Sequence, residues 1–251
     1  MRADLVGYVP GTIRSAVRRA ANRFNVDIVR NPFPRRLAKL CALLGIRTLV
    51  DVGANSGQYA TMVRAAGYEG HIVSCEPLSA PFARLRANAA RDPAWHTERL
   101  ALGAKVGEVS VHIAGNSYSS SVLPMLDAHL DAAPESRYVA DERAPMSTVD
   151  RLLTGYTHLP DQLMLKIDVQ GYEWEVLLGA EQTLSRLAAV QVELSMTPLY
   201  DGQRLMGDIV DLLTSAGLEP WALEPGFCDS RTGRMLQCDG IFVRPAAVAA
   251  R

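Results

Sequence analysis

One stretch, residues 49–57, constrains the fold of this 251-residue chain more than any other. Aliphatic and β-branched residues dominate positions 48–52, which predicts a buried strand. The chain then turns at Gly53 and Gly57, and a helical pattern follows over residues 58–66. A strand, a glycine turn and a helix in this order are typical of a cofactor crevice in an α/β sheet, where bare backbone and helix N–H groups face a ligand. The alternative is an ordinary tight turn.

The spacing of these glycines differs from the dinucleotide fingerprint G-x-G-x-x-G. The third glycine is missing, and Asn55 occupies the middle position. This difference disfavours a nicotinamide cofactor. A nicotinamide-dependent oxidoreductase stays open as an alternative, because it would share the same strand, turn and helix.

A second strand is predicted over residues 71–76, and it ends in Glu76 about twenty positions after the glycines. An acid at the tip of this strand can accept hydrogen bonds from both hydroxyls of a ribose. Pro77 ends the strand, and residues 78–90 have helical spacing. The alternative for Glu76 is a solvated strand end without a ligand.

Residues 51–57 (Asp-Val-Gly-Ala-Asn-Ser-Gly) and 75–77 (Cys-Glu-Pro) resemble motif I and the acidic loop of class I S-adenosylmethionine-dependent methyltransferases. The resemblance implies S-adenosylmethionine as the cofactor. The residues we expect to bind it are Asp51, Gly53, Ala54, Asn55, Gly57, Glu76, Pro77, Ala101 and Leu102.

Charged residues interrupt two further predicted strands. Lys166 and Asp168 lie in or at the end of an apolar run, and burying them is costly unless they are paired or used. Because they are two residues apart, a strand places both on the same face. Glu193 lies at the far end of the next predicted strand, residues 190–194. Three charges at adjacent strand ends predict a functional site. The alternative is a purely structural network of a lysine and carboxylates.

These segments resemble the FkbM-type methyltransferases more specifically. Residues 166–173 (Lys-Ile-Asp-Val-Gln-Gly-Tyr-Glu) are similar to the family's Lys-Ile-Asp-Val-Glu-Gly-x-Glu segment. Gln170 stands where many members carry glutamate, which argues against proton transfer by residue 170. The resemblance runs from about residue 45 to residue 244, and its other blocks are 179–180, 192–195, Tyr200 and 238–244.

The resemblance implies a doubly wound α/β fold, a mainly parallel, seven-stranded Rossmann-like sheet. We expect it to close with an antiparallel hairpin around residues 221–223 and 240–244. The implied activity is O-methylation of a small-molecule hydroxyl, either on a sugar residue of a glycolipid or glycoconjugate or on a polyketide. We favour the sugar.

A hydroxyl acceptor needs a base close to it, and Asp168 and Glu193 are the best candidates for a catalytic role. Lys166 would hold them ionised or orient the acceptor. We expect no metal ligands, but the two carboxylates could instead chelate Mg²⁺ in a metal-assisted sugar O-methyltransferase. A non-catalytic binding protein on the same fold is a further alternative.

Composition limits the partners and the compartment. The net charge of −1 argues against nucleic acid as a partner. The four cysteines lack metal-ligand spacing, which predicts a reduced, cytoplasmic chain. The sequence contains no run of eighteen apolar residues and no recognisable signal peptide, so we expect neither a membrane span nor export.

The amino-terminal part is strongly basic. Residues 1–47 carry ten basic side chains against two acids, about +8, which leaves about −9 for the remainder. Apolar residues between 13 and 24 recur at helical spacing with arginines opposite. Such a helix could make peripheral contact with an anionic membrane or receive a phosphate-bearing substrate, or it could dock on the core domain or on a second subunit of a homodimer. We favour docking, because its apolar face is mostly alanine.

Three domains follow from these patterns: a basic helical extension over 1–44, the methyltransferase domain over 45–245 and a tail over 246–251. Within the domain, residues 97–102 and 108–114 look like two strands paired through a tight connection. Residues 115–121 form a polar loop that either contacts a ligand or is simply mobile. Prolines divide residues 124–145 into short helical pieces, and residues 146–153 predict a capped helix.

Overall fold

The computed structural model describes residues 32–249. The helix predicted between residues 13 and 24 and the last two residues of the tail lie outside this range. The described residues from Pro34 onward form one compact unit. The helix α2, Phe33–Leu44, thus belongs almost entirely to this unit, together with the sheet.

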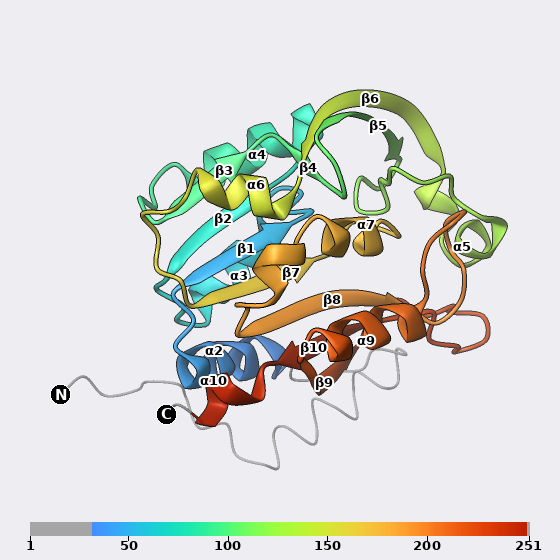
Figure 1. Ribbon diagram of the computed structural model, residues 1–251. Helices are drawn as coiled ribbons and strands as arrows, with labels where there is room; N and C mark the ends of the chain where they lie inside the picture. Colours follow the sequence, from blue (N-terminus) through green and yellow to red (C-terminus); the bar gives the residue numbers. More distant parts are fainter. Residues whose placement is uncertain (1–31, 250–251) are drawn as a thin grey trace, which may run out of the picture. The chain divides into compact units, whose positions relative to one another are not determined.

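This unit is built on a seven-stranded sheet with the strand order β3-β2-β1-β7-β8-β10-β9 (Figure 1). Its strands are β1 Thr48–Val52, β2 His71–Cys75, β3 Trp95–Glu98, β7 Leu163–Ile167, β8 Ala189–Ser195, β9 Glu219–Pro225 and β10 Gln237–Val243. All pairs are parallel except those of β10 with β8 and β9. The predicted doubly wound fold and its closing antiparallel hairpin are therefore confirmed.

The strand order reverses at β1, which has β2 on one side and β7 on the other. In open α/β sheets, ligands bind at such a switch point, outside the carboxyl ends of the strands. The helices are α2, α3 Gln58–Ala65, α4 Ser79–Ala89, α5 Asp127–Ala132, α6 Val149–Thr154, α7 Glu173–Leu178, α8 Glu181–Leu184, α9 Met206–Ser215 and α10 Pro245–Ala249. Among residues 32–249, no helix is both long enough and apolar enough to cross a bilayer.

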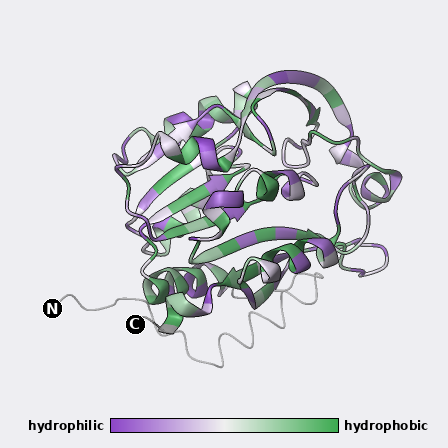
Figure 2. Ribbon diagram, viewed as in Figure 1, coloured by the Kyte–Doolittle hydropathy of each residue, from purple (hydrophilic) through white to green (hydrophobic). Residues whose placement is uncertain are grey.

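The two faces of the sheet are packed differently. On one face, apolar side chains of β1, β2, β7 and β8 form a single core with α6, α7, α8 and α9. Figure 2 shows this apolar character along β1, β7 and β8. On the other face, α2 contacts β7 through Cys41 Sγ, 4.0 Å from Met164 Sδ, and α3 places Tyr59 over polar side chains of the strands.

A second, three-stranded sheet with the order β4-β6-β5 corrects two expectations. Its strands are β4 Ala101–Leu102, β5 Gly107–Ala114 and β6 Tyr138–Ser147. The predicted pairing of residues 97–102 with 108–114 is wrong, because β3 joins β2 in the large sheet and β5 pairs with β6. Residues 138–147 are a strand and not helical, since their pairing with the distant β5 overrides a local pattern that was mostly polar.

The predicted helix near residue 148 is confirmed. Thr148 is the N-cap of α6, and its side chain accepts a hydrogen bond from the backbone N–H of Arg151 at 3.1 Å. This bond satisfies one of the free donors at the helix start. The cap fixes the point where the chain leaves the small sheet and returns to the large one.

Gly53 joins the first turn to the end of β7. Its φ is +78°, and a Cβ built on it would lie 1.8 Å from the backbone oxygen of Asp168. The side of Gly53 where a Cβ would lie is therefore filled by the backbone of Asp168, so this position needs glycine for packing within the protein. Gly67 offers a comparison, because its φ is +99° and a Cβ there would meet nothing within 4 Å.

We therefore expect Gly53→Ala to destabilise the protein more than Gly67→Ala does. The left-handed backbone alone should cost Gly67→Ala about 1–2 kcal/mol. Gly53→Ala adds a backbone clash, so its total should reach roughly 2–5 kcal/mol. Urea unfolding of both variants measures the difference, and equal costs would contradict this packing argument.

Candidate active site

A cavity opens at the carboxyl ends of β1, β2 and β7, where the strand order reverses. It holds ≈ 800 Å³ of empty space, counting the space at its mouth. Its walls come from the turn after β1, the end of β2, β4 and β5 of the small sheet, the loop after β5 and the turn after β7. A pocket of this size, with apolar walls and a few polar groups, is suited to a small molecule or cofactor.

The turn after β1 is held against the end of β2. The backbone N–H groups of Gly53 and Ala54 both donate to the carbonyl of Cys75, at 3.1 and 3.0 Å. Asn55 follows in a left-handed conformation with a φ of 47°, and its side-chain oxygen accepts from the N–H of Ser56 at 2.8 Å. Asparagine tolerates this conformation better than most residues, which explains its place between the two glycines.

Glu76 lies in the cavity wall and is only 5% exposed. One carboxylate oxygen accepts from the N–H of Asn55 at 2.9 Å and the other from the N–H of Leu78 at 2.8 Å. Each oxygen keeps a further lone pair for a ligand hydroxyl. Burial raises the pKa of Glu76 to about 7, although the two backbone donors oppose the rise.

A row of polar side chains crosses the buried sheet beside this cavity. Ser74, Asp51, Lys166 and Gln191 are register neighbours on β2, β1, β7 and β8, so their side chains share one face. Lys166 Nζ lies 3.3 Å from Asp51 Oδ1, and Ser74 Oγ donates to Asp51 Oδ2 at 3.2 Å. The Trp95 indole N–H donates in turn to Ser74 Oγ at 3.0 Å.

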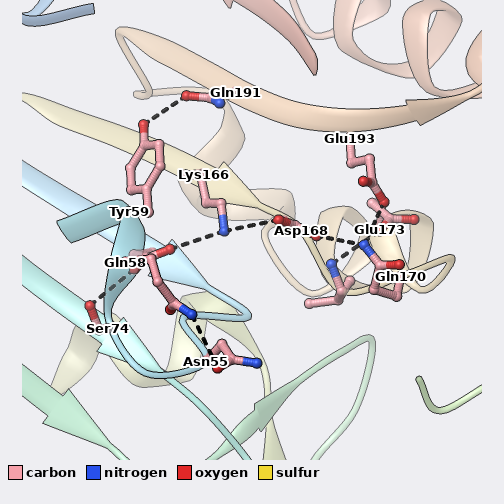
Figure 3. A network of polar contacts seen from close by, with 12 residues as sticks. Asn55, Gln58, Tyr59, Ser74, Lys166, Asp168, Gln170, Glu173, Gln191 and Glu193 are labelled. Atoms are coloured by element: carbon pink, nitrogen blue, oxygen red, sulfur yellow. Dashed lines mark hydrogen bonds and ion pairs between the residues drawn. The ribbon is translucent and has the colours of Figure 1, made fainter. Parts of the chain in front are cut away.

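Lys166 carries a buried charge that neighbouring groups compensate. Its Nζ also lies 3.5 Å from Asp168 Oδ2 and 5.2 Å from the centre of the Tyr59 ring (Figure 3). Burial tends to lower the pKa of Lys166, but Asp168 and Asp51 outweigh it and hold the pKa above its usual value. Complete burial raises the pKa of Asp51, and Lys166 works against that rise. The prediction that Lys166 and Asp168 share a face is confirmed.

A second row of side chains is acidic. It lies two residues beyond the first row on β2, β7 and β8 and continues onto β10. It contains Glu76, Asp168, Glu193 and Asp239, the last of which is the register partner of Glu193. Burial first, and then the neighbouring carboxylates, raise the pKa of Glu193 well above its usual value. The same causes raise the pKa of Asp239 to about 6.

Two carboxylates of this row, Asp168 and Glu193, are joined by one amide. Gln170 Nε2 donates to Asp168 Oδ1 and to Glu193 Oε2, at 2.9 Å in both cases (Figure 3). Gln237 Nε2 also donates to Glu193 Oε2, at 2.7 Å. Asp168 and Gln170 line the cavity, and Glu193 is hydrogen-bonded to Gln170 behind them.

Comparison with known proteins identifies the family. The family model of the methyltransferase FkbM domain matches residues 51–220. The chain belongs to the FkbM methyltransferase family. A curated relative is the 2-O-methyltransferase NoeI of Sinorhizobium fredii, which is 24% identical over 173 residues, 66% of this chain and 71% of NoeI.

Solved methyltransferase structures are similar at lower identity. A putative O-methyltransferase from Klebsiella pneumoniae is 10% identical, with 96% of this chain and 92% of that chain covered and a TM-score of 0.47. The magnesium protoporphyrin IX methyltransferase of Synechocystis PCC 6803, with bound S-adenosylmethionine, is 10% identical, with 95% and 86% covered and a TM-score of 0.45.

Because the chain belongs to the FkbM methyltransferase family, S-adenosylmethionine is its cofactor, as the resemblance implied, and the nicotinamide alternative is set aside. The cavity fits such a molecule. Leu78, Leu100 and Leu102 offer apolar walls that could contact an adenine, and the Glu76 carboxylate could accept hydrogen bonds from a ribose.

The expected cofactor residues of this FkbM methyltransferase occupy two layers. Gly53, Asn55, Glu76, Pro77, Ala101 and Leu102 line the cavity. Asp51, Ala54 and Gly57 lie buried beneath it and shape the turn. Asp168 also lines the cavity, whereas Lys166 and Glu193 lie behind Asp168 and Gln170.

Sequence reasoning missed several polar residues of this site. Asp239 interrupts an apolar strand, a signal equal to that of Asp168 which could have found it. Gln237 and Gln191 are neutral amides in β10 and β8, and only their contacts with Glu193 and Tyr59 show their place in the network.

The buried ion pair leads to a test of stability. Removing one partner of a buried pair leaves an uncompensated charge, so Lys166→Met should lower the free energy of unfolding by about 3–5 kcal/mol at neutral pH. Arg186→Met removes an exposed pair with Asp161 and should cost less than about 1 kcal/mol. Urea unfolding measures both variants.

The loss in Lys166→Met should also depend on pH. Without the lysine, the raised pKa of Asp51 favours the protonated form of this side chain in the folded protein. The variant therefore loses stability as pH rises from the ordinary pKa of an aspartate towards the raised pKa of Asp51. Its deficit relative to the wild type should be smaller at pH 5 than at pH 8. A deficit below 1 kcal/mol, or one equal at both pH values, would contradict the ion-pair interpretation.

Proposed function

We propose that this protein transfers a methyl group from S-adenosylmethionine to a hydroxyl of a small molecule, giving a methyl ether. The observation that carries the proposal is the pair of carboxylates, Asp168 and Glu193, joined through Gln170 beside the cofactor cavity. A hydroxyl acceptor loses its proton during methylation, and a carboxylate within hydrogen-bond reach can take it.

The cofactor would lie along the turn after β1. Glu76 would accept hydrogen bonds from the ribose hydroxyls, Asn55 would present its backbone, and Pro77 would border the adenine with Ala101 and Leu102. Asp51, Ala54 and Gly57 would act indirectly, by holding the turn in shape. These roles are supported by the position of each residue in or beneath the cavity wall.

When bound, the cofactor supplies a methyl carbon that is already electrophilic, because it is attached to a sulfonium. The protein has to align the acceptor oxygen with that carbon and take up its proton. As the new O–CH₃ bond forms, the S–CH₃ bond breaks, its electron pair stays on sulfur, and the proton goes to a carboxylate oxygen.

Glu193 and Asp168 would divide this work. The raised pKa of Glu193 makes it the stronger base, which favours it for proton removal near neutral pH. Asp168 faces the cavity and contacts Lys166, so it would orient the hydroxyl while Lys166 keeps its charge balanced.

We infer that the acceptor is a polyhydroxyl compound, such as a sugar residue of a glycoconjugate, with a polyketide as the second choice. Two features support the sugar: the relative NoeI is named a 2-O-methyltransferase, and Asp168, Glu193, Asp239 and Gln237 offer several hydrogen-bonding groups at one strand edge. Mass spectrometry of products from a panel of sugars and glycolipids, incubated with S-adenosylmethionine, tests the proposal. The expected result is a glycan product that is heavier than its acceptor by one CH₂ group, because a methyl replaces the hydroxyl hydrogen.

A magnesium-assisted reaction is the second candidate, because two carboxylates face one another. The amide nitrogen of Gln170 lies between them, 2.9 Å from each, and supplies the positive end of a dipole where a cation would otherwise bridge. This contact favours a base without a metal.

We propose a cytoplasmic location for the protein. The four free cysteines fit a reducing cytoplasm. We propose that the basic segment docks on the core domain or on a second subunit of a homodimer, and peripheral membrane contact is the alternative.

The ribose assignment predicts a pH dependence. An ionised Glu76 accepts hydrogen bonds from both ribose hydroxyls. The affinity for S-adenosylhomocysteine should therefore rise as pH increases through about 7 and then level off. Glu76→Gln should remove this dependence and weaken binding above pH 7 by roughly 30- to 150-fold, or about 2–3 kcal/mol. Calorimetry between pH 5.5 and 8.5 measures both, with the exposed Glu181→Gln as the control. Wild-type affinity in Glu76→Gln would refute the assignment.

The catalytic assignment predicts a separation of binding from turnover. Asp168→Asn and Glu193→Gln should bind the cofactor within a few-fold of the wild type, and the variant lacking the base should lose about 10²–10⁴ in rate. Asp161→Asn, an exposed acid, serves as the control. Excess EDTA should leave the wild type unaffected, whereas loss of activity restored by Mg²⁺ would favour the second candidate. Full turnover in both amide variants would mean that neither carboxylate is the base.

A further inference from the structure

Gln170 is held on every side although it has no assigned role. Its amide nitrogen contacts Asp168 and Glu193, and its amide oxygen accepts from the Tyr200 hydroxyl at 2.8 Å. Its backbone oxygen accepts from Ser121 Oγ at 2.6 Å. The residue therefore links the loop after β5 to the two carboxylates beside the cavity.

Tyr200 determines which way the amide points. The Tyr200 side chain is fully buried, and burial raises the pKa of its phenol far above the usual value, so the hydroxyl keeps its proton. The hydroxyl donates to the amide oxygen, with the Ser119 carbonyl as a longer second acceptor at 3.4 Å, and the carboxylate oxygens accept from the amide nitrogen. Both N–H groups of that nitrogen are then used, one for each acid.

The backbone of Gln170 adds a second observation. Its φ is 55°, a left-handed conformation that disfavours a glutamine and suits glycine or asparagine. Local stability alone would favour a shorter residue at this turn. The strained conformation is retained where a side chain long enough to reach both Asp168 and Glu193 is required.

We propose that Gln170 is a positioning residue, whose amide holds Asp168 and Glu193 at one fixed separation and is itself held by Tyr200. This inference rests on the proposed function, in which these carboxylates act on the acceptor hydroxyl. A neutral donor also allows the two acids to lie close together, whereas a glutamate would add a third negative charge.

Gln170→Asn separates positioning from a structural role. Asparagine accepts the left-handed backbone better and keeps an amide, but it is one methylene too short to span both acids. We expect its melting temperature to equal or exceed that of the wild type. The apparent pKa of Glu193 should nonetheless rise by about one unit, because its charged form loses a donor.

Carbon-13 NMR of the side-chain carboxyls measures this pKa with S-adenosylhomocysteine bound, and the Glu193→Gln variant assigns the signal. Lys166 from β7, Glu173 from α7 and Asp239 from β10 also face Glu193, and they are unchanged in every variant compared.

Three further variants complete the test. Gln170→Met removes both donors and should shift the pKa as Gln170→Asn does. Tyr200→Phe releases the amide and should shift it less, and the exposed Gln162→Met should leave it unchanged. An unchanged pKa of Glu193 in both Gln170 variants, or a lower melting temperature of Gln170→Asn without a pKa shift, would overturn the proposal.

Turnover distinguishes this proposal from the proposed function. Once an acceptor is identified, kcat should fall about 10- to 100-fold in both Gln170 variants. The KM for S-adenosylmethionine should stay within threefold of the wild-type value. If Asp168→Asn and Glu193→Gln keep full turnover, the proposed function fails whatever the Gln170 variants do. If those two lose turnover and both Gln170 variants keep it, only the positioning role is refuted.

Discussion

The buried ammonium group of Lys166 is the interaction on which the centre of this protein depends. It lies on β7 between Asp51 of β1 and Asp168, where the strand order reverses and the cavity opens. A charge at this depth is stable only with its partners in place, so the ion pairs tie β1 to β7. Its positive charge holds the carboxylates of Asp51 and Asp168 in place.

Two further acids build the loops around the cavity by binding backbone. Glu76 accepts from two N–H groups of the first turn and of the start of α4, and Glu173 accepts from Val169 and Gly171 in the turn after β7. These turns would otherwise leave buried donors without partners. The same type of side chain therefore serves as a structural acceptor at Glu76 and Glu173 and as a candidate base at Glu193, and burial raises the pKa of all three.

The resemblance to the FkbM-type methyltransferases implied the seven-stranded sheet and its closing hairpin. The sequence itself predicted the individual strands and the cofactor turn, because apolar runs, glycines and strand-tip charges are local signals. It failed for the small sheet. β6 is largely exposed and polar, so its strand state depends on the distant β5, and no periodic pattern reports that pairing. The close contact between Gly53 and the backbone of Asp168 was not predicted either, since only the fold brings these two turns together.

What the sequence determined by itself is the chemistry available: an FkbM methyltransferase sheet, a cofactor turn, and the charges Lys166, Asp168 and Glu193 at adjacent strand ends. The tertiary structure alone decided how those charges are used. Asp51 became a buried counter-ion, Glu193 gained two amide donors, and Gln170 came to bridge two acids. Such contacts join residues up to 115 positions apart, from Asp51 to Lys166, and arise only when the strands lie side by side, which is why no spacing along the chain encodes them.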